Sequence, residues 1–281
     1  MKTISKIAGM RRWSEAARAK GRRVAFVPTM GCLHEGHLSL VRKARREADL
    51  VVVSIFVNPL QFGPKEDFKR YPRNLRRDAG LARREGCDAL FVPSPREMYP
   101  AGYRTRVTVE GTEEVLCGRS RPGHFSGVAT VVLKLVNVVW PDVLLLGQKD
   151  AQQAVVIKRM LQDLNAGVRV VVCPTVREKD GLAVSSRNSY LSADERRRAL
   201  GLSRSLFLAR RLVRTGERRA AVIIAGMRKV LSEAGVTDVD YLEILDAAEL
   251  TPLRRLDGDV LIAAAARVGR TRLIDNVRLK V

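Results

Sequence analysis

The sequence predicts an α/β fold, in which a Rossmann-like parallel sheet has helices on both faces and is followed by a smaller α+β C-terminal domain. Three observations support this prediction: short apolar runs end at proline, helical patterns separate these runs, and the alternation stops near residue 175. Apolar runs of this kind are typical of strands buried on both faces, as in parallel sheets. We expect the first domain to span residues 1–175 and the second residues 176–281.

The first βαβ unit lies near the N-terminus. Val24–Val27 is an apolar run that stops at a proline, and Leu38–Ala48 has apolar residues at helical spacing. Leu50–Val57 is a second apolar run, ended by Asn58-Pro59. A strand, a helix and a buried strand in this order form a βαβ unit.

The later elements follow in chain order. The first domain continues with a helix at Leu75–Glu85, a strand at Ala89–Val92, an edge strand at Thr105–Glu110, a helix at Val128–Val139, a strand at Val143–Leu146, a helix at Ala151–Leu164 and a strand at Val168–Val172. The polar segment Thr175–Ser192 is predicted to be a hinge or an active-site loop. The second domain has helices at Ala193–Arg214 and Arg218–Ala234 and strands at Val239–Leu245, Val260–Arg267 and Arg272–Val277, the last two joined by the turn Val268-Gly269-Arg270.

The composition argues against several classes of protein. No apolar run reaches the roughly 18 residues needed to span a bilayer, and the N-terminal residues lack the apolar core of a signal peptide. We therefore expect a cytoplasmic protein with no membrane partner. The four cysteines are scattered and none has Cys-x-x-Cys spacing. In a chain of this length, such cysteines are typically free thiols in a reducing compartment.

The net charge of +21, from 51 Lys+Arg against 30 Asp+Glu, is unusual. Such a surface could hold nucleic acid, could concentrate small anionic substrates, or could be a solvated arginine-rich surface. The basic pairs are spread along the chain, and aromatic residues, at 5%, do not interleave with them. We favour the solvated surface, with attraction of small anions as a side effect, and expect no nucleic-acid partner.

The loop Pro28–His37 follows the first strand, and ligands of open α/β sheets bind at the carboxyl ends of strands. Gly31 and Gly36 would let the backbone approach a phosphate, and a helix N-terminus supplies N–H groups. His34 and His37, two of the chain's three histidines, are three residues apart and could donate to a triphosphate attacked at its α-phosphorus. Zinc is the alternative ligand, but no third protein ligand is evident. The loop therefore predicts a triphosphate site.

Three further polar clusters lie at strand ends or between the domains. Phe56–Phe62 contains Gln61, which offers a donor and an acceptor, although a simple turn explains the segment equally well. Gly147–Gln153 contains Lys149 at a strand-to-helix turn, where lysine suits phosphates and the next aspartate could cap the helix or orient the lysine. Ser185–Asn188 is either a lid over phosphates or a turn that caps the next helix.

Together these segments resemble the pantothenate synthetase (pantoate–β-alanine ligase) family of the nucleotidyltransferase superfamily, which is related to class I aminoacyl-tRNA synthetases. The His-x-Gly-His motif alone indicates only the superfamily. Phe-Val-Asn-Pro-x-Gln-Phe and Gly-x-Lys-Asp-x-Gln-Gln are far more specific. The matching segments cover most of the chain, in the family's order: Pro28–His37, Phe56–Phe62, Pro122–Leu133, Gly147–Gln153 and Pro174–Leu191.

The resemblance implies an ATP-dependent condensation of (R)-pantoate with β-alanine in two steps. ATP and pantoate would give pantoyl adenylate and pyrophosphate, with Mg²⁺ on the ATP phosphates and no protein side chains as its ligands. The amine of β-alanine would then attack the adenylate and release AMP and pantothenate. The resemblance also implies a homodimer whose other partners are these small molecules alone.

Roles for individual residues also come from the resemblance. His37 is the position that the family assigns as proton donor, and His34 and Lys149 would join it in catalysis. Gln61 would contact pantoate and β-alanine, Gln153 would contact pantoate, and Asn58 would also bind substrate. The ATP site would be lined by Met30, Gly31, Cys32, Leu33, His34, Glu35, Gly36, His37, Gly147, Gln148, Lys149, Asp150, Val176, Val184, Ser185, Ser186 and Arg187.

Four positions in the matching segments stand apart. Gln148 stands where the family commonly has glutamate, Ala151 where an aromatic residue is frequent, and Val184 where methionine is frequent. His124 lies within a matching segment, and we assign it no chemical role.

Overall fold

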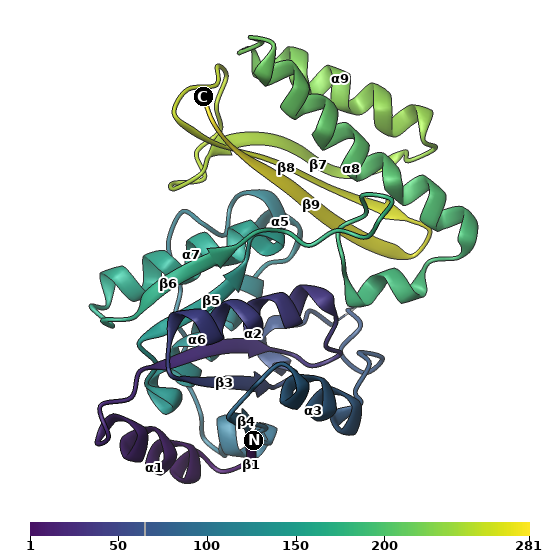
Figure 1. The fold of residues 1–281 in the computed structure, drawn as a ribbon. Coiled ribbons are helices and arrows are strands. Elements are labelled where there is room, and N and C mark those ends of the chain that lie inside the picture. The colour runs from purple at the N-terminus through teal and green to yellow at the C-terminus, as the bar shows by residue number, and fades with distance from the viewer. Residues whose placement is uncertain (65) are drawn as a thin grey trace. The chain divides into compact units, whose positions relative to one another are not determined.

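A six-stranded parallel sheet organises the first part of the chain in the computed structural model, which describes residues 1–64 and 66–281 (Figure 1). Its strands lie in the order β1-β4-β3-β2-β5-β6. Their bounds are β1 Lys2–Ile4, β2 Val24–Thr29, β3 Leu50–Ile55, β4 Ala89–Phe91, β5 Val143–Gly147 and β6 Arg169–Cys173. After β2 the chain adds β3 and β4 on one side of that strand, and it later adds β5 and β6 on the other side. The topological switch point therefore lies between β2 and β5.

The chain forms two compact units. Unit 1 comprises Met1–Glu113, Arg121–Gly147 and Val156–Pro174. Unit 2 comprises Glu114–Ser120, Gln148–Val155 and Thr175–Val281.

Helices cover both faces of the unit 1 sheet, as the fold class requires. They are α1 Ile7–Arg18, α2 Glu35–Glu47, α3 Leu75–Arg84, α4 Pro95–Met98, α6 His124–Val139 and α7 Ala151–Asp163, the last crossing from unit 2. On one face, Leu38 and Val41 of α2 and Ala82 of α3 pack with the strands. Because nearly all of β2 is buried, it has no polar face, which is why Val24–Val27 is a continuous apolar run.

Two details of unit 1 differ from the prediction. The edge strand predicted at Thr105–Glu110 is wrong, because its polar groups bond to side chains of α6 instead of a sheet edge. The Val107 N–H donates to Thr130 Oγ1 at 2.9 Å, and Thr108 Oγ1 to Ser126 Oγ at 3.3 Å. The free edge of β4 is occupied by the three-residue strand β1, which is too short to show a pattern in the sequence.

Unit 2 contains an antiparallel sheet in the order β7-β8-β9. Its elements are α5 Leu116–Ser120, the 3₁₀ helices η2 Gln148–Asp150 and η3 Ser186–Tyr190, α8 Ala193–Arg214, α9 Ala220–Glu233, β7 Asp238–Asp246, β8 Asp259–Val268 and β9 Thr271–Lys280. The predicted α/β fold with a smaller α+β domain is therefore confirmed, and so is the turn between β8 and β9.

Strand β8 is buried on both faces, and its alternate residues belong to two apolar clusters. Ile262 and Ala264 pack with α8 and α9, whereas Leu261 and Ala263 pack with Leu116 and its neighbours. This second cluster explains why short segments from earlier in the chain belong to unit 2.

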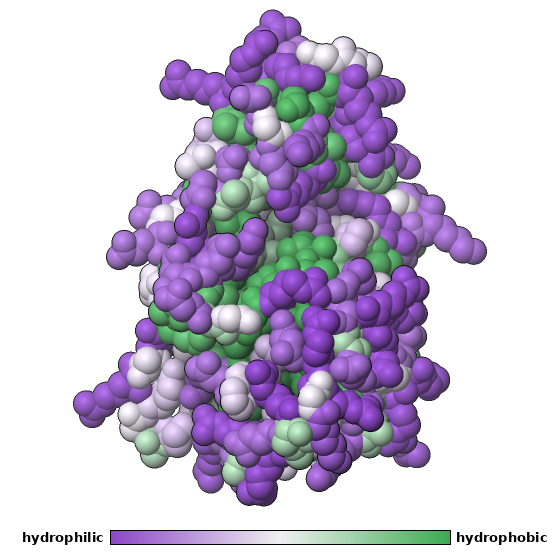
Figure 2. All heavy atoms as spheres, turned by 60° about the vertical axis from the view of Figure 1, so that its left-hand side comes forward, coloured by the Kyte–Doolittle hydropathy of each residue, from purple (hydrophilic) through white to green (hydrophobic). Residues whose placement is uncertain are grey.

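Hydrophilic and apolar side chains both reach the face drawn in Figure 2. On the face drawn in Figure 2, hydrophilic side chains are spread over both units. Among the residues that the structure describes, no helix has both the length and the apolar character needed to cross a bilayer.

Candidate active site

The unit 1 residues predicted to bind ligands follow neighbouring parallel strands. Met30–His37 follows β2, the 3₁₀ helix η1, Pro59–Gln61, follows β3, and Gly147 ends β5. Since β2 pairs in parallel with both β3 and β5, these segments share the carboxyl edge of the sheet. This is the edge where ligands of such folds bind.

The turn after β2 requires a glycine. Gly31 has a φ of +83°, a left-handed conformation that favours glycine. A Cβ on Gly31 would lie 3.0 Å from Cγ2 of Ile55 and 3.1 Å from Oδ2 of Asp78. The Gly31 N–H donates to Thr29 Oγ1 at 3.1 Å, which bonds in turn to the Ser54 carbonyl at 2.7 Å. The loop is thereby tied to β3.

A buried carboxylate holds the middle of this loop. Asp78, on α3 and 1% exposed, accepts the N–H of Cys32 at 2.8 Å and that of Leu33 at 2.9 Å. Asp78 was not among the predicted site residues, because its neighbours on the helix are basic. Two of the loop's N–H groups thus already donate to Asp78, so a phosphate would have to bind to other groups of the loop.

His34 and His37 lie together where α2 begins. His34 is the N-cap of α2, and the ring centroids of the two histidines are 4.1 Å apart. The His34 N–H donates to His37 Nδ1 at 3.4 Å, so the proton of a neutral His37 ring is on Nε2. A Cβ on Gly36 would lie 3.0 Å from two atoms of the His34 ring, so glycine leaves room for that ring. His37 is thereby equipped to donate a hydrogen bond from Nε2.

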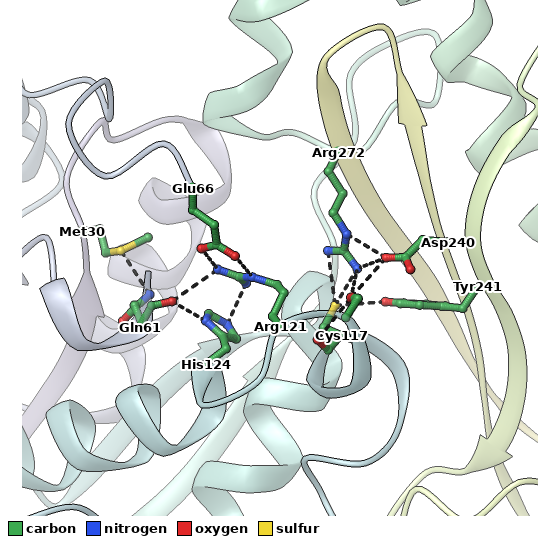
Figure 3. A network of polar contacts seen from close by, with 10 residues as sticks. Met30, Gln61, Glu66, Cys117, Arg121, His124, Asp240, Tyr241 and Arg272 are labelled. Atoms are coloured by element: carbon green, nitrogen blue, oxygen red, sulfur yellow. Dashed lines mark hydrogen bonds and ion pairs between the residues drawn. The ribbon is translucent and has the colours of Figure 1, made fainter. Parts of the chain in front are cut away.

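Gln61 contacts the loop after β2. It is 9% exposed, and its Nε2 lies 3.2 Å from the sulfur of Met30 (Figure 3). Its Oε1 accepts Nδ2 of Asn58 at 3.0 Å. The structure therefore brings together Met30 and Gln61, two residues predicted for ATP and substrate respectively.

Asn58 fixes the orientation of the Gln61 amide. Its Nδ2 donates to the Gly127 carbonyl at 3.0 Å, and its Oδ1 accepts the Leu60 N–H at 3.3 Å and the Tyr99 hydroxyl at 2.8 Å. These backbone groups leave only one orientation for Asn58, and that orientation determines which Gln61 atom is the donor. Asn58 is 1% exposed and uses all four hydrogen-bonding positions of its amide. In this structure Asn58 is placed to orient Gln61, and its predicted contact with substrate stays a prediction.

Burial raises the pKa of the Tyr99 hydroxyl above its usual range. Tyr99 accordingly keeps the proton that it donates to Asn58.

The residues before and at the start of α6 form a polar network with Gln61. Arg121 pairs with Glu66 and contacts the ring of His124, which reaches the Gln61 carbonyl (Figure 3). None of these residues except Gln61 had a predicted role, although His124 belongs to the segment Pro122–Leu133 that matches the family.

In unit 2, Asn276 of β9 binds the turn that carries Lys149. Its Nδ2 donates to the carbonyls of Gln148 and Lys149 at 2.9 Å each, and its Oδ1 accepts Nε2 of Gln148 at 2.8 Å. The Gln148 side chain therefore supports this turn. The ammonium of Lys149, whose side chain is 21% exposed, is 3.8 Å from Asp150.

The two glutamines of α7 differ in their surroundings. Gln152 is 5% exposed, accepts the Cys117 N–H at 2.9 Å and donates to the Val115 carbonyl at 2.8 Å. Gln153, predicted to bind pantoate, is half-buried. Gln152 thus anchors the start of α5 and the residue before it.

The segment with the remaining predicted ATP residues is folded and anchored within unit 2. The Val184 N–H donates to the Val176 carbonyl at 3.0 Å, which brings these two predicted residues together. Between them, Arg177 makes a bidentate pair with Asp275, at 2.6 and 2.8 Å. Ser185 Oγ accepts the Arg187 N–H at 3.3 Å and caps η3, whereas Ser192 caps α8.

A second polar network in unit 2 surrounds Cys117. Its sulfur lies 3.2 Å from the Tyr241 hydroxyl and 3.4 Å from Nη2 of Arg272, whose Nε donates to Asp240 at 2.8 Å (Figure 3). Burial raises the pKa of the Tyr241 hydroxyl. This network links α5 to β7 and β9.

The described residues contain no group of three or more His, Cys, Asp or Glu side chains that could hold a metal ion. Within that part of the chain, His34 and His37 therefore belong to no such group.

Comparison with known proteins gives a consistent result. The family model described as pantoate–β-alanine ligase matches residues 2–278. A pantothenate synthetase of Moorella thermoacetica is 57% identical over 281 residues, which cover 100% of this chain and 99% of that protein. One of Heliobacterium modesticaldum is 55% identical over 281 residues, with 100% of each chain covered.

Solved structures of the same family are also similar to this chain. The pantothenate synthetase of Thermus thermophilus is 46% identical, with a TM-score of 0.93 and 99% of each chain covered. The pantoate–β-alanine ligase of Francisella tularensis, complexed with β,γ-ATP and β-alanine, is 34% identical, with a TM-score of 0.81 and coverage of 99% of this chain and 97% of that one. With its sheet order, its paired histidines and these full-length similarities, the chain belongs to the pantoate–β-alanine ligase family.

Proposed function

We propose that the chain carries out the activity of its family, the ATP-dependent condensation of pantoate with β-alanine, through the residues described above. In the first step, a pantoate carboxylate oxygen attacks the α-phosphorus of ATP, and pyrophosphate leaves. In the second, the β-alanine amine attacks the acyl carbon of pantoyl adenylate, AMP leaves with the bridging oxygen, and the nitrogen loses a proton.

His37 stabilises the first transition state. Negative charge builds up on the phosphate oxygens as pyrophosphate departs, and a neutral donor fixed in place lowers the barrier. The contact between Nδ1 and the His34 N–H keeps the donor on Nε2. His34 packs against His37 and holds its ring. Of the remaining ATP residues, Lys149 supplies a point charge to the phosphates.

Gln61 binds pantoate through its amide N–H. In the structure that group faces the thioether sulfur of Met30 at 3.2 Å, and sulfur is a weak acceptor. An oxygen of pantoate would be a stronger acceptor, so the exchange of partners favours binding. Asn58 keeps Oε1 of Gln61 occupied, which leaves the N–H group to face the substrate.

Gln153 contacts pantoate, and Gln61 also contacts β-alanine. The residues assigned to ATP in unit 2 are Gln148–Asp150, Val176 and Val184–Arg187. The adenylate must be kept from water until the amine arrives, and we assign that task to Ser185–Arg187.

Mg²⁺ enters as part of the substrate. Magnesium usually retains several waters and is bound through substrate phosphates with one or two carboxylates. We therefore propose that Mg²⁺ arrives on the phosphates of ATP. A cytoplasmic location and a homodimer complete the proposal, and light scattering against the chain mass of 31.2 kDa tests the dimer.

The observation that carries the proposal is the contact of Gln61 with Met30, at the same sheet edge as the histidine pair. The test is ATP–pyrophosphate exchange with candidate acids. We expect exchange that requires pantoate and not β-alanine, and AMP formation that requires both. Exchange without any acid, or with nicotinamide mononucleotide, would indicate another nucleotidyltransferase and contradict the proposal.

A further inference from the structure

The start of α6 and the segment before it hold Gln61 at two points. The side chain is oriented through Asn58, whose Nδ2 donates to the Gly127 carbonyl at 3.0 Å. The main-chain carbonyl of Gln61 lies 2.8 Å from Nδ1 of His124 and 3.4 Å from Nη2 of Arg121 (Figure 3). The main chain of Gln61 is therefore attached to α6 through His124, and its side chain is attached to α6 through Asn58.

Arg121 determines which nitrogen of His124 carries the proton. A guanidinium group only donates hydrogen bonds, and Nη1 of Arg121 lies 2.8 Å from Nε2 of His124. Nε2 must therefore accept, which leaves the proton of the ring on Nδ1. That proton is donated to the Gln61 carbonyl. A charged imidazole would direct an N–H toward the guanidinium, so this arrangement requires neutral His124.

Glu66 holds Arg121 in turn. Nε and Nη2 of Arg121 donate to the two carboxylate oxygens at 2.6 Å each, and the two side chains are 18% and 25% exposed. Bidentate pairs fix the plane of the guanidinium. Burial by itself would raise the pKa of Glu66, but the hydrogen bonds and charge of Arg121 outweigh it and lower the pKa. The carboxylate is therefore ionised at neutral pH and can orient Arg121.

Gly127 lets α6 touch the backbone of η1 directly. A Cβ at this position would lie 2.4 Å from the Leu60 carbonyl oxygen and 2.8 Å from Cα of Gln61. Because no side chain separates the two backbones, a shift in the first turn of α6 would displace Gln61.

We propose that Arg121 and His124 are positioning residues for Gln61, with His124 acting as a neutral Nδ1 donor whose tautomer Arg121 imposes. The inference rests on the proposed function, in which the Gln61 amide contacts pantoate. A residue held through both its main chain and its side chain loses little freedom when substrate binds. Misplacement of a substrate-binding group by as little as about 1 Å can cost about 100-fold in rate.

Variants of His124 test this role in pantoate-dependent ATP–pyrophosphate exchange. His124→Ala lacks the donor, His124→Asn places an amide N–H near the Nδ1 position, and His124→Gln places one near Nε2. We expect the Ala and Gln variants to lower kcat/KM for pantoate by about 10- to 100-fold, with KM for ATP unchanged. His124→Asn should recover most of the activity, and the exposed control Arg104→Lys should show no loss.

A double-mutant cycle separates positioning from general damage. If His124 acts through Gln61, His124→Ala should lower kcat/KM for pantoate by less than about twofold in the Gln61→Ala background. The inference is overturned if His124→Ala lowers kcat/KM for pantoate as much in that background as in wild type, or if it does not lower it in wild type. If Gln61→Ala itself leaves the KM for pantoate unchanged, the proposed function fails, and the inference falls with it.

A spectroscopic measurement on the unaltered protein checks the tautomer. Nitrogen-15 shifts of the His124 ring should show a neutral ring protonated at Nδ1 at neutral pH, and Arg121→Met should abolish this preference. A ring protonated at Nε2, or a charged ring, would overturn the assignment.

Discussion

At the scale of the residue, His37 is expected to act on the transition state more than on the bound substrate. His37→Ala should lower kcat of the exchange reaction by about 100-fold or more, because a donor to developing charge is lost. His37→Gln restores a neutral N–H and should regain part of the rate. Steady-state kinetics with varied ATP decides the matter: a change in KM alone would mean that His37 only binds.

Glu66 should make stability depend on acidity. Burial raises its pKa and Arg121 lowers it, with a net decrease from 4.5. A carboxylate with a lowered pKa in the folded state stabilises at pH above its unfolded pKa, and that contribution is lost as the pH falls through the folded pKa. Glu66→Gln should therefore reduce the free energy of urea unfolding near neutral pH, with the difference from wild type closing as the medium becomes acidic. A difference that is constant with pH would rule out this ion pair as its source.

Polar residues at strand ends were predictable, but their partners were not. His37 and Gln61 belong to recognisable motifs at expected positions. Asp78 lies 45 residues from Leu33 in the sequence. It follows a pair of arginines, so in the sequence it resembles a charged residue on the solvent-exposed face of a helix. Only the packing of α3 against the loop after β2 buries it. His124 and Arg121 likewise acquire a role only through contacts that the fold creates.

At the scale of the element, the contact between α6 and η1 can be tested at Gly127. Gly127→Ala would place a methyl group 2.4 Å from the Leu60 oxygen, so the two elements must separate. Overpacking of this kind usually costs about 1–3 kcal/mol of stability. We expect a lower unfolding temperature together with a raised KM for pantoate, and a smaller effect on the KM for ATP.

Gly226→Ala in α9 is a suitable control for that experiment. A Cβ there would lie no closer than 3.4 Å to a neighbouring atom, the end of the Leu208 side chain. A Gly127 variant that keeps wild-type stability and pantoate affinity would show that η1 tolerates displacement.

Elements were predictable where burial left a pattern in the sequence. Strands such as β2 and β3 are covered on both faces, so their residues are apolar apart from Thr29 and Ser54 near the strand ends. Helix α8 has the predicted bounds. Thr105–Glu110 has an alternating pattern without forming a strand, because its hydrogen bonds are made to α6. Alternation describes which side chains are buried, and says nothing about which partner the backbone finds.

At the scale of the whole molecule, the net charge of +21 should attract ATP. Attraction between exposed charges weakens as the Debye length shortens to about 10 Å at 0.1 M salt. We expect kcat/KM for ATP to fall a few-fold from low to moderate salt, while the value for β-alanine, which has no net charge, changes little. An equal response of both substrates would show that salt acts on the protein generally.

Attack of the pantoate carboxylate on the α-phosphorus of ATP is tested most directly by an isotope measurement. Pantoate labelled with oxygen-18 in its carboxylate is condensed with β-alanine, and the products are examined by mass spectrometry. The adenylate route predicts one labelled oxygen in AMP and one in pantothenate. AMP without label, or label in inorganic phosphate, would contradict it.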